Sequence, residues 1–428
     1  MATLRSPGYL LVLVVAAVFG APIALLSYGF LELSLYAQGW LFTDLSRAMG
    51  FGEAPIWWPL PVVTAGGFLV GLVIRWLPGR GGESPVDGFK SSGAPSARDL
   101  PGIATAALVT LAFGAVLGPE APLIALGSGI AAWGVHLLKR DAPAQGIALI
   151  GAAGSFAAIS TLLGSPLLGA FLLMEVAGLG GATVSMVLVP GLLASGIGAL
   201  VFIGLDSLTG LVKPSLTIPD LPPAAAPTVA EFGWALVIGV AAAVIGTAIR
   251  SLGATLHRLV EQRLLIATSA AGLVVALLAV SYDAATPRSA SDVLFSGQVQ
   301  LGPLISNAAE YSAATLLLLL LCKGLAYAVS MSAFRGGSVF PAMFLGAAGG
   351  LALSHLPGLA TIPAAAMGIG AMCVSILGFP LVSVLLATLL LLPDGVDTMP
   401  LVIVSVVVAY VGRAWLSPET RQAAAEPP

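Results

Sequence analysis

The stretch from Gly114 to Gly129 reads GAVLGPEAPLIALGSG and carries a single charged residue, Glu120, between Pro119 and Pro122. An ionised side chain at the hydrocarbon level of a membrane costs about 2.5–3.5 kcal/mol on insertion scales, so such residues are generally functional. The flanking prolines and glycines interrupt helices, and membranes accept irregular backbone only where protein, water or a ligand satisfies it. We therefore expect Glu120 to line a transport pathway; the alternative is a buried, neutral acid at a helix end.

The composition predicts a multi-pass protein of the cell membrane. Of the 428 residues, 58% are hydrophobic and only 9% are charged, with a mean hydropathy of +1.03, whereas soluble domains carry about 25% charged residues. The first apolar run, residues 10–31, is longer than the roughly 7–15 apolar residues of a signal peptide. We expect this run to be a retained first span of an all-α bundle in the lipid bilayer.

Several classes of function are disfavoured by the sequence. The 17 Lys and Arg residues are scattered and the net charge is −3, so no nucleic-acid partner is expected. Cys322 and Cys373 lie in separate apolar segments without a Cys or His at metal-ligand spacing, so neither a metal nor a cofactor is expected. A membrane-embedded hydrolase is the alternative from another class, because Ser92 and several acids are present. It would need a base beside the serine or an HExxH motif, and the sequence supplies neither signal.

The chain reads as two similar halves. A proline-rich join predicts a first half over residues 1–206, a linker over 207–229, a second half over 230–416 and a disordered tail over 417–428. GPEAPLIALGSG is followed by LLGSPLLGAFLL in the first half, and GGSVFPAMFLGAAGG is followed by ILGFPLVSVLL in the second. Transporters often contain such repeats, with broken helices that meet near the midplane. A duplicated unit is the simplest interpretation, and chance recurrence of Gly-Pro breaks is the alternative.

The interrupted helices indicate an anion site. A helix start has unpaired N–H groups and about half a positive charge from the aligned peptide dipoles. It holds an anion without the strong attraction of a full cation, which would slow release. Candidate helix starts follow residues 91–95 and lie around residues 118–122 and 336–341. We expect the three to form one anion-binding site.

These motifs, in this order, resemble those of the CLC chloride channel and transporter family. The family's GSGIP resembles residues 91–95, its GREGP or GKEGP resembles 118–122, its GxFxP resembles 337–341, and its NAPLAG resembles 164–169. The resemblance implies a prokaryotic-type member without cytoplasmic CBS domains, folded as an inverted-repeat bundle of tilted, discontinuous helices. It also implies a homodimer with one chloride pathway per subunit.

The resemblance also implies roles for individual residues. Glu120 would be the gate, whose carboxylate competes with the anion and moves away when it is protonated or displaced. Ser92 would offer its hydroxyl to the anion; considered alone, this serine would be a helix N-cap. The other residues implied to form the anion site either supply backbone groups to the anion or lie next to residues that do. They are Gly93, Ala94, Gly118, Pro119, Ala121, Gly337, Ser338, Val339 and Phe340.

The sequence departs from the family pattern where protons are concerned. Proton-coupled members commonly end one helix with two glutamates, and here Glu175 is followed by Val176. Glu175 is a candidate residue of the proton route. Alternatively, its side chain caps a helix or pairs with another group near a helix end. Leu416 stands where the family has an anion-contacting tyrosine. We therefore favour uncoupled or weakly proton-coupled, channel-like chloride conduction, with a chloride/proton antiporter as the alternative.

One basic residue lies within an apolar segment. Lys323 follows Cys322, and we expect it to snorkel or to pair near a helix end. The alternative is that Lys323 adds positive potential to an anion route.

Overall fold

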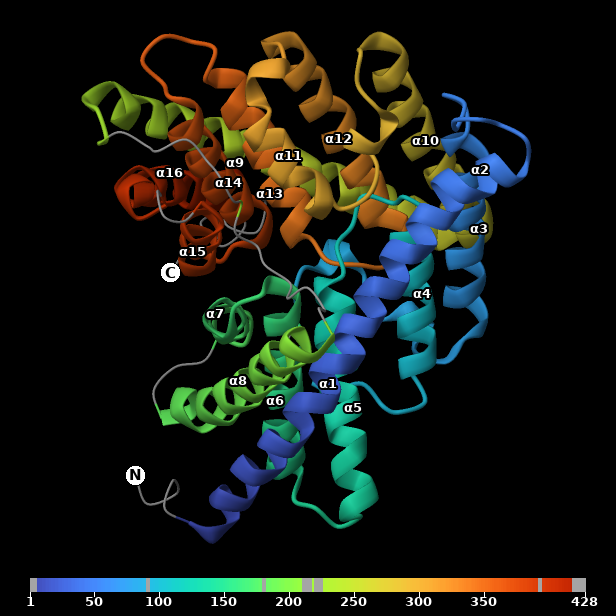
Figure 1. Ribbon diagram of the computed structural model, residues 1–428, viewed down its shortest axis with the longest axis vertical. Helices are drawn as coiled ribbons and strands as arrows, with labels where there is room; N and C mark the ends of the chain where they lie inside the picture. Colours follow the sequence, from blue (N-terminus) through green and yellow to red (C-terminus); the bar gives the residue numbers. More distant parts are fainter. Residues whose placement is uncertain are drawn as a thin grey trace, which may run out of the picture.

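The computed structural model describes residues 6–89, 93–178, 182–209, 218, 226–391 and 395–417. Over these residues the chain is helical, without a named strand, which confirms the all-α prediction (Figure 1). Nine of the described helices are long and apolar enough to cross a membrane. The helices are α1 (Pro7–Gly39), α2 (Leu45–Ala48), α3 (Pro59–Trp76), α4 (Leu100–Ala112), α5 (Glu120–Leu138), α6 (Ala144–Leu163), α7 (Pro166–Val176), α8 (Ala182–Thr209), α9 (Val229–Gln262), α10 (Leu264–Ala285), α11 (Gln298–Ser306), α12 (Ala313–Ala333), α13 (Val339–Leu353), α14 (Thr361–Leu377), α15 (Pro380–Leu390) and α16 (Gly395–Leu416).

The same packing partners recur in the two halves of the chain. In the first half, α1 packs on α6 and α8, and α6 also packs on α5 and α7. In the second half, α9 packs on α14 and α16, and α14 also packs on α13 and α15. In Figure 1, α5 to α8 lie below α13 to α16. This recurrence supports the interpretation of a duplicated unit. Most of the expected linker and tail lies outside the described residues.

Equivalent pairs of glycines allow close contact within each half. A side chain at Gly127 or Gly154 would meet the backbone of the other residue, where α5 crosses α6. Gly346 and Gly368 make the corresponding contact between α13 and α14. Such small residues allow helix backbones to approach in a membrane, where packing rather than hydrophobic burial drives association. The two contacts fix the helices that begin at residues 120 and 339.

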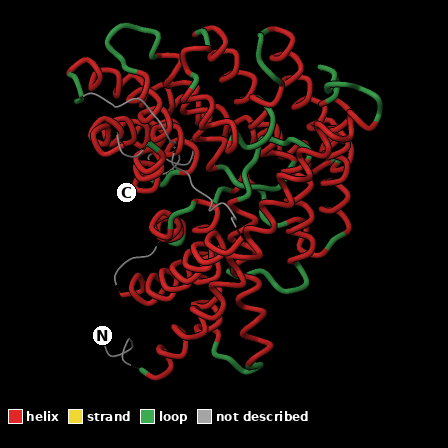
Figure 2. The backbone as a smooth tube through the Cα atoms, in the orientation of Figure 1, coloured by secondary structure: helices red, strands yellow, loops and turns green. Residues whose placement is uncertain are grey.

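Irregular backbone is buried between the halves, at the places where the sequence predicts helix breaks. Residues 114–119 lie between α4 and α5 and are buried, and green loop segments lie among the red helices in Figure 2. Their polar groups have partners from the second half. The Val116 N–H donates to Ser330 Oγ (3.0 Å), and the Gly114 carbonyl accepts from the Phe295 N–H (3.2 Å). Protein atoms thus satisfy the freed backbone, as burial in a membrane protein requires.

Lys323 corrects one sequence prediction, because it neither snorkels nor pairs at a helix end. Its side chain is fully buried in α12. Its three N–H donors are shared among four consecutive carbonyls of the α10–α12 connection, those of Asp292, Val293, Leu294 and Phe295, at 2.8–3.3 Å from Nζ. The loop turns these carbonyls inward, where the ammonium is their buried partner. Lys323 therefore holds the loop whose Phe295 N–H binds Gly114.

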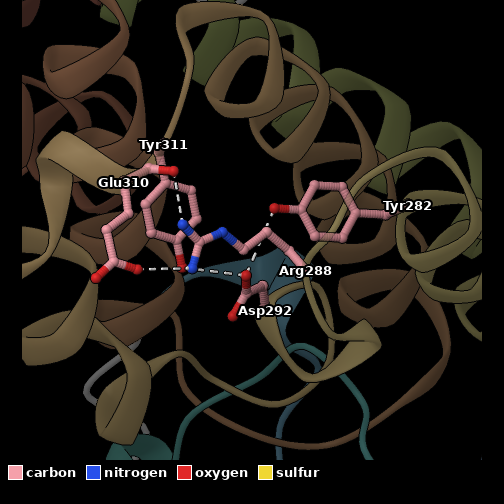
Figure 3. A network of polar contacts seen from close by, with 5 residues as sticks. All are labelled: Tyr282, Arg288, Asp292, Glu310 and Tyr311. Atoms are coloured by element: carbon pink, nitrogen blue, oxygen red, sulfur yellow. Dashed lines mark hydrogen bonds and ion pairs between the residues drawn. The ribbon is translucent and has the colours of Figure 1, made fainter.

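The outer side of this loop carries a second set of polar contacts (Figure 3). The Asp292 carboxylate accepts hydrogen bonds from the hydroxyls of Tyr311 (3.3 Å) and Tyr282 (3.5 Å). Arg288 bonds to Glu310 (3.2 Å) and lies over the Tyr311 ring. Burial raises the pKa of Asp292, and Lys323 opposes that shift. Burial and the Asp292 charge raise the pKa of Tyr311 to about 12, so this hydroxyl remains a donor near neutral pH.

Replacing Lys323 with methionine is expected to lower the free energy of unfolding by about 2–4 kcal/mol, because the buried carbonyls lose a charged donor. Thermal unfolding in detergent measures the loss. Lys139→Met is the matched control, since Lys139 is exposed at the end of α5. Equal unfolding temperatures for the two variants would contradict a stabilising role for the Lys323 contacts.

Candidate functional site

Glu120 is the first residue of α5 and has no exposed surface. Its Oε1 accepts a hydrogen bond from the Phe340 N–H (2.8 Å). Phe340 lies in the first turn of α13, where backbone N–H groups have no partner within the helix. The carboxylate of one broken helix therefore occupies the amino terminus of the other. The predicted anion-site residues Val339 and Phe340 lie here, and both are buried.

Gly118 and Gly337 hold the two helix starts together and leave room for the carboxylate. The Gly118 N–H donates to the Gly337 carbonyl (2.8 Å), and the Gly337 N–H donates to the Gly118 carbonyl (2.5 Å). A Cβ at either glycine would collide with the carboxylate of Glu120. Pro119 and Ser338 occupy the N-cap positions of α5 and α13. The structure thus brings together the second and third predicted motifs around Glu120.

Two buried polar atoms near this contact have no hydrogen-bond partner among the described residues. One is the second carboxylate oxygen of Glu120, Oε2. The other is the hydroxyl of Tyr327 on α12, which lies near Ser338 and Glu120. Buried polar groups are nearly always paired, and exceptions often mark functional sites. The environment of Glu120 therefore retains hydrogen-bonding capacity for a ligand or proton.

A cavity of about 440 Å³ extends to this site from one side of the protein. Its lining includes the predicted site residues Gly93, Ala94, Ala121, Gly337 and Ser338. Ser92 lies outside the described residues. The cavity therefore reaches both helix starts at the backbone that surrounds Glu120, and it borders the described part of the first motif.

Glu175 caps a helix in this structure. Its Oε1 accepts from the Leu381 N–H (3.0 Å) and its Oε2 from the Val382 N–H (2.7 Å), both in the first turn of α15. A carboxylate is stabilised at a helix amino terminus by these N–H groups and by the helix dipole. This contact matches the alternative that the sequence left open for Glu175, and its role in a proton route stays a prediction.

Sequence reasoning missed two residues near the site. Arg335 lines the cavity. In the sequence it directly precedes Gly336 and Gly337 at the third motif, and this position could have marked it as a candidate site residue. Tyr327 is one of many residues in the apolar helix α12. No spacing or composition distinguishes its hydroxyl, because only the packing of α12 places it near Glu120.

The sequence matches the family described as "Voltage gated chloride channel" over residues 66–413. The chain is 29% identical over 370 residues to "Putative ion-transport protein YfeO" of Escherichia coli O7:K1, covering 84% of this chain and 82% of that protein. It is 27% identical over 376 residues to the protein of the same name from Salmonella schwarzengrund, covering 85% and 86%.

Solved structures show the same fold at low sequence identity. A slow cyanobacterial Cl⁻/H⁺ antiporter aligns with a TM-score of 0.78 at 17% identity, covering 98% of this chain and 99% of that one. A CLC-type fluoride/proton antiporter aligns with a TM-score of 0.63 at 20% identity, covering 95% of both. The fold, the paired helix starts and the family match over most of the sequence lead to one conclusion: this multi-pass membrane protein belongs to the CLC family of voltage-gated chloride channels and transporters.

Proposed function

We propose that this protein carries chloride and similar anions across the cell membrane, with Glu120 as the gate. The observation that supports this function best is the hydrogen bond from the Phe340 N–H to the Glu120 carboxylate. A backbone site that holds a carboxylate oxygen suits a free anion of the same charge once the side chain leaves. The cavity that ends beside Gly337 and Ser338 gives such an anion access from one side. Glu120 is thus a tethered competitor for the anion.

Protonation of Glu120 is the proposed opening step. An ionised carboxylate is held by the amide and by the positive end of the α13 dipole. A neutral carboxyl group loses most of that attraction, so the anion gains the site. Flux should therefore rise as the pH falls. This is transport rather than enzyme chemistry, since no covalent step is involved.

Proton exchange is the second candidate function. Two structural neighbours are named as proton antiporters, which favours it. Against a proton role for Glu175, both of its oxygens are held by the amides of α15, and its neighbour Val176 cannot carry a proton. We therefore retain uncoupled or weakly coupled conduction as the preferred mode. The homodimer with one pathway per subunit stays a proposal from the resemblance.

Liposomes with simultaneous chloride and proton electrodes test the function and separate its two modes. The preferred mode predicts chloride efflux when a potassium ionophore clamps the voltage, with little proton movement against a gradient. Stoichiometric uphill proton transport driven by chloride would reject uncoupled conduction. If Glu175 carries those protons, Glu175→Gln would abolish the uphill transport. An absence of flux for every anion tested would contradict the proposed function itself.

A further inference from the structure

Arg335 is built into the wall of the cavity beside the proposed gate. It lies between the end of α12 and the Gly336–Gly337 pair. Its backbone N–H donates to Thr110 Oγ1 on α4 (3.3 Å). Its stem passes over Gly81, where an added Cβ would lie 3.2 Å from Arg335 Cγ. Gly81 also has a φ of +75°, which favours glycine. These contacts place the guanidinium at the cavity and limit where it can move.

The Arg335 guanidinium has N–H donors that form no hydrogen bond with the described residues. One nitrogen, Nη1, donates to the Phe334 carbonyl (3.1 Å). The Nε atom is buried and has no hydrogen-bond partner in the described part of the chain. No described carboxylate lies within ion-pair distance of Arg335, and the negative charges that act on it, Asp87 and Glu261, are farther away. An arginine carries five N–H donors in a planar fork, and leaving a buried charged donor unpaired is costly. A ligand with acceptor oxygens at the cavity face of the guanidinium would offset part of that cost.

The other charged residues of the cavity lie nearer to solvent. Arg80 and Glu83 are exposed, and the partly exposed Asp99 accepts a hydrogen bond from Ser96 (2.7 Å). Of the charged groups that line the cavity, only Arg335 combines a buried, unpartnered nitrogen with a place beside the Gly337 backbone. An anion entering towards the proposed gate would therefore meet this guanidinium.

We propose that Arg335 forms a binding subsite for a small planar oxyanion, such as nitrate, in the cavity on the approach to Glu120. The inference rests on the proposed function and adds a preference among anions. A guanidinium binds two oxygens of a planar anion through two parallel N–H bonds, whereas a spherical halide cannot use both in that geometry. The backbone donors of the gate do not make this distinction. Arg335 thus favours oxyanions over chloride before the gate is reached.

Two measurements on the purified full-length protein test this subsite. Nitrate and chloride binding are measured by isothermal titration, and the nitrate-to-chloride flux ratio is measured in liposomes. Arg335→Lys keeps the charge but loses the planar fork, so nitrate affinity and the flux ratio should each fall about tenfold, while chloride flux changes much less. Arg80→Lys, the same change in an exposed residue of the same cavity, should leave both quantities unchanged.

Each outcome bears on a distinct claim. An unchanged nitrate affinity and flux ratio in Arg335→Lys would overturn the subsite and leave the proposed function intact. A wild-type protein without any anion flux would contradict the proposed function, and the titration would still decide the subsite. If Arg335→Lys does not fold, Arg335→Gln takes its place, with nitrate-dependent thermal stabilisation of the wild type as the second readout. Equal stabilisation by nitrate and chloride would count against the proposal.

Discussion

Replacing Glu120 with glutamine is expected to raise chloride flux at neutral pH and to remove its dependence on pH. Glutamine has nearly the same shape as glutamate but no negative charge, so it resembles the protonated gate at every pH. In the wild type, the protonated fraction of a single, mostly ionised carboxyl rises about tenfold for each unit of pH decrease. Flux should follow that fraction until the gate is mostly protonated. In Glu120→Gln, the flux should be high and flat over the same range.

The measurement is chloride efflux from liposomes between about pH 7.5 and 4.5. Carboxyl groups in folded proteins commonly gain or lose a proton within this range. Glu53→Gln is the matched control, because Glu53 is exposed in the loop between α2 and α3. It should keep the wild-type pH profile. A Glu120→Gln protein with the wild-type profile would show that another group senses pH.

A methyl group at Gly337 is expected to block the anion site as well as to displace the gate. The Cβ of Gly337→Ala would occupy the space of the Glu120 carboxylate. The backbone of Gly337 itself does not need glycine, because its φ is not positive. The carboxylate would therefore have to leave the Phe340 amide. An anion at the same amide would meet the same methyl group, so chloride flux should fall by about tenfold or more, because the lost charge-assisted hydrogen bond is worth about 1.5–3 kcal/mol.

A double substitution separates this explanation from a general distortion. If the methyl group fills the anion site, Gly337→Ala should also lower chloride flux in the Glu120→Ala background, where the gate carboxylate is absent. Gly349→Ala is the control within α13, because its Cβ would meet only Leu320 at ordinary contact distance, 3.7 Å. Unchanged or higher flux from Gly337→Ala in that background would contradict an anion site beside Gly337.

Much of the fold follows from local sequence signals. Glycines and prolines interrupt apolar segments at the places where α5, α13 and α15 begin, because they either lack a side chain or lack the N–H that a helix interior uses. The isolated charge at Glu120 then indicates a candidate site, because desolvation is too costly for an incidental acid. Glu120, Gly337 and Phe340 were therefore predictable as one site before their contact was known.

The remaining features depend on contacts between segments distant in sequence. The Gly118–Gly337 pairing joins two loops from different halves. Lys323 finds its carbonyl partners about 30 residues away, in a loop that the sequence marks only as polar. Arg335 gains its environment from α4 and from the loop that holds Gly81. No local propensity encodes these neighbours, so the snorkelling or helix-end pairing expected of Lys323 was wrong and the position of Arg335 was missed.

The central claim is that an anion and the Glu120 carboxylate compete for the amino terminus of α13. Anomalous diffraction from Glu120→Gln crystals grown in bromide tests it most directly, because bromide is both a chloride substitute and an anomalous scatterer. The account predicts a bromide peak within hydrogen-bonding reach of the Phe340 N–H, at the place that the carboxylate of the wild type occupies. Well-ordered crystals with no bromide at that amide would contradict the account.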